Sequence, residues 1–113
     1  MAIQKEIELE NGIILNYHRI TSFNKITNIS NNIEISSYIS ETQRNKENAY
    51  QKAQIKNANQ EELTVEEQEL LNNGINVLVE ADFVQIPYNA DMTIKDAYEY
   101  LKTTEKYENA EDI

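Results

Sequence analysis

His18 is the only histidine in the chain of 113 residues, and therefore the only side chain whose ordinary pKa lies near neutrality. As a general base it would need a nucleophile and an orienting carboxylate within hydrogen-bond reach. The strand register expected below places Lys5 opposite His18, and lysine carries no carboxylate. We therefore interpret His18 as a strand histidine at a sheet surface or contact, and not as a catalytic residue.

Two acidic segments have the composition of a cation site without its spacing. The first segment is an expected helix that carries three carboxylates at neighbouring positions, Glu66, Glu67 and Glu69. Side chains at neighbouring helical positions point in different directions. The three carboxylates are better explained as a solvated first turn favoured by the helix dipole. Residues 89–91 lack the central glycine and final glutamate of a calcium loop. Since cysteine is also absent, the sequence predicts no catalytic residue, no metal site and no cofactor.

The aromatic content is mostly tyrosine, with seven tyrosines and no tryptophan. Tyrosine is favoured at protein interfaces because it buries a large rigid ring and keeps a hydrogen-bonding tip. We expect Tyr17 and Tyr38 to project from the sheet face opposite the isoleucines, although ordinary half-buried packing would also explain them. The hairpin tip near Ile13 and Leu15 is apolar on both faces, so the rest of the domain or a partner must cover it. The candidate protein-contact residues are therefore Ile13, Leu15, Tyr17, Arg19 and Tyr38.

The stretch from Ile3 to Ile20 carries the clearest structural instruction, Asn11-Gly12 between two isoleucine-rich runs. Asn-Gly is the favoured pair for a two-residue type I′ turn, in which both residues have positive φ. An isolated hairpin is marginal in water, so further strands or a helix must cover this one. The expected register pairs Leu9 with Ile14, Ile7 with Asn16, Lys5 with His18 and Ile3 with Ile20.

Two further strands are expected after the hairpin. Residues 21–32 are rich in Thr, Ser and Asn, which favours a bent extension of the second strand that ends in a loop. Residues 33–39 alternate apolar and polar side chains and predict a third strand. Residues 75–86 predict a fourth strand that ends before Pro87, with Val79, Ala81 and Phe83 sharing one face.

Helices are expected in the insertion at residues 40–73 and near the C-terminus. The first part of the insertion has a thin apolar stripe, which suits a surface helix or a partly mobile excursion. Its second part begins with a capping box at Thr64 and ends at Gly74. Thr93 opens a last helix, whose apolar face can lie across the sheet. Residues 105–113 form an acidic tail that we expect to be frayed.

The sequence therefore predicts one α+β domain over residues 1–113. Its small antiparallel sheet would consist of the N-terminal hairpin and two further strands, with the helical insertion between them and the C-terminal helix packed on the sheet. The formal net charge of −10 argues against nucleic acid or an anionic membrane as partner. The chain shows neither a membrane span nor a signal-peptide core, and lacks disulfides, so we expect synthesis in the cytoplasm.

Three segments carry a resemblance to known proteins: ELENGIILNYHRI, ISSYISETQRNKE and FVQIPYNADMTIKDAYEYLKT. The chain resembles small proteins of Firmicutes phages and prophages that are encoded among late structural genes, near tail or baseplate and lysis functions. The likeness covers about two thirds of the chain, and residues 49–73 look like an insertion relative to shorter members.

The resemblance implies a non-enzymatic structural protein that is located in the virion after assembly in the bacterial cytoplasm. Expected partners are other phage structural proteins and further copies of the chain in a homo-oligomer. The net charge supports an alternative, in which the protein is a cytoplasmic acidic inhibitor. In that role it would mimic nucleic acid and occupy the nucleic-acid site of a host protein.

Overall fold

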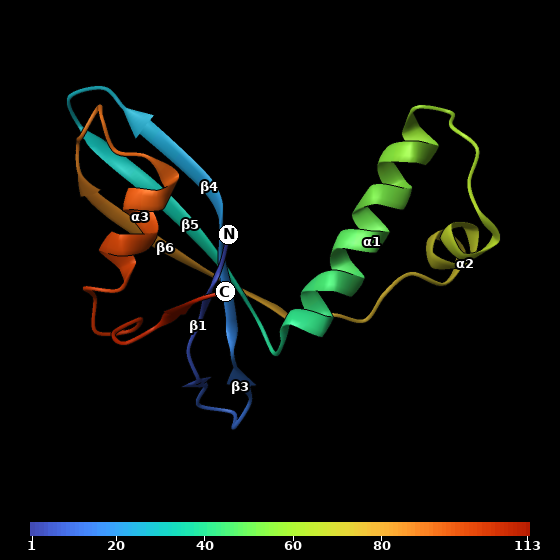
Figure 1. The fold of residues 1–113 in the computed structure, drawn as a ribbon, viewed down its shortest axis with the longest axis horizontal. Helices are drawn as coiled ribbons and strands as arrows, with labels where there is room; N and C mark the ends of the chain where they lie inside the picture. The colour runs from blue at the N-terminus through green and yellow to red at the C-terminus, as the bar shows by residue number, and fades with distance from the viewer.

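The computed structural model describes residues 1–113 as a five-stranded sheet, a two-stranded ribbon and three helices (Figure 1). Strands in the large sheet follow the order β6-β5-β4-β1-β7, and every pairing is antiparallel. The predicted α+β class is confirmed. The elements are β1 Ile3–Gln4, β2 Ile7–Glu8, β3 Ile14–Leu15, β4 Tyr17–Ile26, β5 Ser30–Tyr38, α1 Glu41–Ala58, α2 Val65–Asn73, β6 Val79–Pro87, α3 Ile94–Leu101 and β7 Glu111–Asp112.

The ribbon of β2 and β3 has a three-residue loop in place of the predicted two-residue turn. The N–H of Gly12 donates to the carbonyl of Leu9 at 2.9 Å, and the N–H of Leu9 donates to the carbonyl of Ile13 at 2.8 Å. Gly12 has φ of 85°, whereas Asn11 does not have positive φ. A type I′ turn needs positive φ at both residues, so that prediction is wrong; the geometry is a turn closed by a glycine bulge.

The extra loop residue changes the strand register. Ile7 pairs with Leu15 instead of Asn16, a slip of one residue, and Ile3 pairs with His18 instead of Ile20, a slip of two. A slip of one residue turns every side chain of a strand to the opposite face. As a result Leu15 is buried, whereas its neighbour Ile14 is 46% exposed.

The two longest strands, β4 and β5, include most of the polar stretch at residues 21–32, which we expected to extend the second strand and to end in a loop. Their register is continuous from Tyr17↔Tyr38 to Ile26↔Ser30, with one irregularity between Ile20 and Ser22. A tight turn joins them, with Asn28 at φ of 62°, a left-handed conformation that asparagine tolerates. The predicted bent extension of the second strand is therefore present as β4. The loop that follows it is shorter than expected, because residues 30–32 already belong to β5, where polar side chains are compatible with a strand that has one uncovered face.

The core lies between one face of the sheet and α3 (Figure 1). The capping box at Thr93 fixes the start of α3, and its apolar side packs on the sheet, as predicted. The C-terminal tail is not frayed: β7 pairs with β1, and the N–H of Ile113 donates to the carbonyl of Ala2 at 3.0 Å. Two apolar residues of the tail, Tyr107 and Ala110, are buried in the core and hold the tail in place. The buried core residues are Ile3, Ile33, Ile35, Ile86, Ala97, Tyr98, Leu101, Tyr107 and Ala110.

Helices α1 and α2 form a projection that we call the arm, residues 39–78. The strands on either side of the arm are paired at Tyr38 and Val79, so the chain leaves and re-enters the sheet at one place. Ser40 caps α1, and the predicted capping box at Thr64 is present at α2. The radius of gyration is 16.4 Å, compared with about 13 Å for a compact domain of this length. The arm therefore extends away from the body, as Figure 1 shows.

Candidate functional site

The five predicted contact residues do not form one exposed surface. Leu15 is 2% exposed and Tyr38 is 1% exposed, so both are buried within this fold. Ile13, Tyr17 and Arg19 are partly exposed. Leu15 points inward because of the register change in the ribbon. Tyr38 is covered because only two residues separate the end of β5 from the start of α1. Neither side chain can therefore offer its surface to a partner.

Tyr17, Arg19 and Tyr38 are nevertheless brought together on one face of the sheet. Tyr17 and Tyr38 are paired across β4 and β5, with ring centroids 5.8 Å apart and an edge-to-face angle of 71°. The Nε of Arg19 donates to the Tyr38 hydroxyl at 3.2 Å. This is the arrangement expected from strand alternation, although Tyr38 has an internal role.

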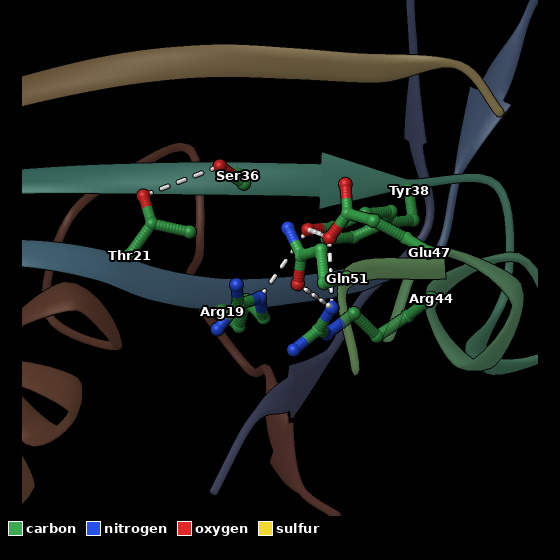
Figure 2. A network of polar contacts seen from close by, with 7 residues as sticks. All are labelled: Arg19, Thr21, Ser36, Tyr38, Arg44, Glu47 and Gln51. Atoms are coloured by element: carbon green, nitrogen blue, oxygen red, sulfur yellow. Dashed lines mark hydrogen bonds and ion pairs between the residues drawn. The ribbon is translucent and has the colours of Figure 1, made fainter. Parts of the chain in front are cut away.

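The Tyr38 hydroxyl is the centre of a network that we call the arm joint (Figure 2). It donates to Oε1 of Glu47 at 2.7 Å, and Arg44 forms an ion pair with the same oxygen at 2.8 Å. Arg44 also donates to Oε1 of Gln51 at 3.2 Å. Burial raises the pKa of Tyr38, and the hydrogen bond from Arg19 opposes that effect. The joint therefore fixes α1 to the sheet, with a neutral phenol at its centre.

His18 is completely buried and fully hydrogen-bonded. Its Nε2 lies 2.7 Å from the carbonyl oxygen of Lys5, and its Nδ1 lies 2.7 Å from Oγ of Ser37. A carbonyl oxygen can only accept, so Nε2 carries the proton and Nδ1 accepts from the serine hydroxyl. The Ser–His pair resembles part of a catalytic triad, yet no carboxylate orients the ring and no solvent reaches it. This arrangement supports a structural role. The predicted pairing of Lys5 with His18 is wrong, because Ile3 is the residue paired with His18 and Lys5 contributes only its carbonyl oxygen.

We expect the burial of His18 to make the protein less stable in mild acid. Desolvation lowers the pKa of His18 below the ordinary value of 6.5, because the buried ring disfavours a charge. Below pH 6.5 the unfolded chain then binds a proton more readily than the folded chain does. The free energy of unfolding therefore has its full value above pH 6.5 and declines as the pH falls through the lowered pKa. Urea unfolding between about pH 7 and pH 5 measures the loss. A free energy of unfolding that stays constant over that range, or a His18 ring that titrates normally by NMR, would contradict this account.

The sheet face opposite α3 carries a shallow hollow of about 480 Å³ that crosses β4, β5 and β6. Phe83 stands at its side with 72% of its surface exposed. Buried Ile33 and half-buried Val84 belong to the core face, so they contribute mainly backbone to the floor. The lining consists of Ser22, Asn24, Asn32, Ile33, Glu34, Phe83, Val84 and Gln85. We call this feature the sheet hollow.

The sequence interpretation missed the sheet hollow for two reasons. The polar residues at the end of β4 and the start of β5 were expected where the extended second strand gives way to a loop, so they were assigned to no sheet face. In β6, the alternation that groups Val79, Ala81 and Phe83 correctly identifies one face, but that face is the uncovered one. The opposite face carries Asp82, which accepts hydrogen bonds from Tyr107 and Lys106 at 3.2 Å each. Satisfied polar groups can occupy the covered face, so apolar character alone did not identify the core side.

No group of three or more histidine, aspartate or glutamate side chains is arranged to hold a metal ion. None of the helices combines the length and the apolar character needed to cross a membrane. Comparisons with protein-family models, curated proteins and solved structures find no match. A functional assignment therefore depends on the surfaces of this fold.

Proposed function

We propose that this protein is a non-enzymatic structural or tail-accessory component of a bacteriophage particle, and that it acts through protein–protein contacts made by its arm. The arm is the observation that carries the proposal. It is inserted between two directly paired strands and projects from a sheet body that has its own core. The three segments that resemble phage late proteins supply the biological context.

The arm contributes little to the core of the body. Ala53 is the single buried residue of its two helices. Apolar side chains are instead presented to solvent, with Ile55 60% exposed and Val65 76% exposed. These side chains are accessible to another protein, although they are spread over two helices. The arm therefore resembles an element retained for binding more than one required for folding.

The arm joint supports binding by fixing the direction of α1. Arg44 and Glu47 are only 15% and 16% exposed, so their ion pair is partly protected from water. A contact element held in position loses less conformational freedom when it binds. Tyr17 and Arg19 lie beside the joint and remain partly exposed, so they can extend the contact surface from the arm onto the sheet. The expected partners are other particle proteins and further copies of this chain.

Peptide mass spectrometry of purified particles tests the proposal. We expect the chain at a fixed ratio to known tail proteins, because a structural component has a defined number of positions. Particles purified through a second, independent density step are the control for loosely attached protein. Detection in the lysate of infected cells, with none in the particles, would contradict a virion location.

The net charge of −10 favours one alternative, an acidic inhibitor that occupies the nucleic-acid site of a host protein. Such binding would depend on clustered positive charge in the partner and would weaken steeply as the salt concentration rises. Affinity capture from host lysate at low and high salt tests it. A host partner retained equally at both salt concentrations would argue against the inhibitor role.

A further inference from the structure

The sheet hollow combines one exposed aromatic ring with side chains that are polar and mostly uncharged. Phe83 comes from β6, Ser22 and Asn24 come from β4, and Asn32 and Glu34 come from β5. Gln85 completes the lining from β6. Rigid strands therefore carry every group, which favours a preformed site over one that must be ordered by its ligand. The volume of about 480 Å³ lies in the range of small-molecule sites.

The polar groups of the sheet hollow hold one another in place and keep hydrogen-bonding capacity. Asn24 donates to Ser22 at 3.0 Å, which leaves the Asn24 carbonyl oxygen free to accept. Asn32 accepts from Ser30 at 3.0 Å, which leaves the Asn32 amide nitrogen free to donate. Gln85 donates to Ser30 at 3.1 Å, so its carbonyl oxygen is a further acceptor. The hollow thus presents both donors and acceptors at fixed positions.

A fourth polar group, Glu34, is held in the same manner. Its Oε1 accepts from the Thr21 hydroxyl at 3.1 Å, and its second carboxylate oxygen can accept from a ligand. Glu34 is also the single charged group of the lining, which contains no lysine or arginine. An anionic ligand would meet this carboxylate without a compensating cation, on a protein of charge −10. A cation would gain little from one partly exposed carboxylate. These charges favour an uncharged ligand.

We propose that the sheet hollow binds a neutral saccharide. A pyranose ring has a face of C–H groups that can lie on Phe83, and its hydroxyl groups both donate and accept, as the side chains of the hollow require. An added peptide strand fits less well, because Oδ1 of Asp82 already accepts from the N–H of Phe83 at 3.0 Å. That bond occupies a backbone donor of β6 that an added strand would need.

NMR titration of the ¹⁵N-labelled full chain with neutral trisaccharides of glucose, mannose, galactose and N-acetylglucosamine tests this site. We expect saturable shifts with at least one of them, in the side-chain amide signals of Asn24, Asn32 and Gln85. Phe83→Ala should weaken that binding about tenfold through loss of the ring. Because Phe83 is 72% exposed, its replacement should leave the fold intact. A trisaccharide of uronic acids should bind more weakly than its neutral counterpart.

Val65→Ala is the matched control, since Val65 is 76% exposed and lies on the arm. It should bind the saccharide like the parent chain. Binding to the insoluble polymer of the same sugar distinguishes two sources of the ligand. Tighter binding to the polymer than to the trisaccharide indicates a surface polysaccharide, and equal affinity indicates a free oligosaccharide. The proposal is overturned if no neutral trisaccharide at tens of millimolar shifts these signals, or if Phe83→Ala binds unchanged. Either failure leaves the particle location untouched, because the protein ratio in particles does not depend on this site.

Discussion

Replacing Tyr98 by phenylalanine is expected to lower the free energy of unfolding by about 1–3 kcal/mol, although only one oxygen atom is removed. Replacement by alanine is expected to lower it by about 3–5 kcal/mol, because the ring of this 3% exposed residue is also lost. Urea unfolding followed by circular dichroism measures both values.

The reason is the position of the Tyr98 hydroxyl between two strands. It accepts from the N–H of Ile20 at 2.8 Å and donates to the carbonyl of Met1 at 2.9 Å. The pairing of Ile3 with His18 would bring Met1 opposite Ile20 if β1 continued. The hydroxyl therefore occupies the place of a backbone hydrogen bond, next to the irregularity of β4. Without it, two backbone groups lose their partner.

Tyr100→Phe is the matched control on the same helix, because the Tyr100 side chain packs beside the core and its hydroxyl has no hydrogen-bond partner in the protein. Its free energy of unfolding should stay within about 0.5 kcal/mol of the parent value. Hydrogen exchange at the Ile20 amide provides a second measurement, which should accelerate in Tyr98→Phe alone. Equal stability of the two phenylalanine variants would show that the hydroxyl does not bridge the strands.

Local chemistry explains which elements could be predicted from the sequence. The capping boxes at Thr64 and Thr93 each need residues only three positions apart, and both are present. The buried side of α3 follows from its helical spacing in the same way. Asn11-Gly12 was ambiguous because a glycine bulge needs positive φ at Gly12 alone, whereas the type I′ turn needs it at both residues. A loop of three residues instead of two shifts the register of the ribbon by one residue, and this shift buries Leu15.

Long-range packing explains the features that could not be predicted from the sequence. The end of the acidic tail pairs as a strand because Tyr107 and Ala110 are buried. Two apolar residues in a charged segment are only a weak sequence signal for such packing. Of the predicted contact residues, Tyr17 and Arg19 remain partly exposed, while Tyr38 is covered by α1, whose position the sequence pattern did not define. The sheet hollow depends on which face of β6 lies away from α3, a property that alternation within one strand cannot decide.

Joining Tyr38 to Val79 by a short linker of glycine, asparagine and serine, in place of the arm, should leave the sheet body folded. The two residues are already paired, so the linker spans a hairpin and adds no new constraint. Each halving of the loop length lowers the entropic cost of closing the loop and raises the free energy of unfolding by about 0.6 kcal/mol. The lost hydrogen bond from Tyr38 to Glu47 has the opposite effect, of about 1–2 kcal/mol. The Tyr38 ring also loses the cover of α1, which costs up to about 2 kcal/mol. We therefore expect the free energy of unfolding to lie about 1–3 kcal/mol below that of the parent.

Small-angle scattering and two-dimensional NMR measure the outcome. The radius of gyration should fall from 16.4 Å to about 12 Å, the value for a compact domain of the remaining length. Amide signals of α3 and of the part of β4 and β5 from Ile20 to Ile35 should keep their positions, because their contacts lie within the body. Loss of dispersed signals would show that the arm is required for folding and is not an added contact element.

The same variant separates folding from assembly, because a folded body without its arm should be absent from purified particles. Tyr38→Phe is the control: it keeps the arm and removes only the hydroxyl that donates to Glu47. If the direction of α1 matters for binding, this control should enter particles at a reduced ratio, between those of the parent and the armless chain. An armless chain that enters at the full ratio would place the partner contact on the sheet body instead, where Tyr17 and Arg19 remain partly exposed.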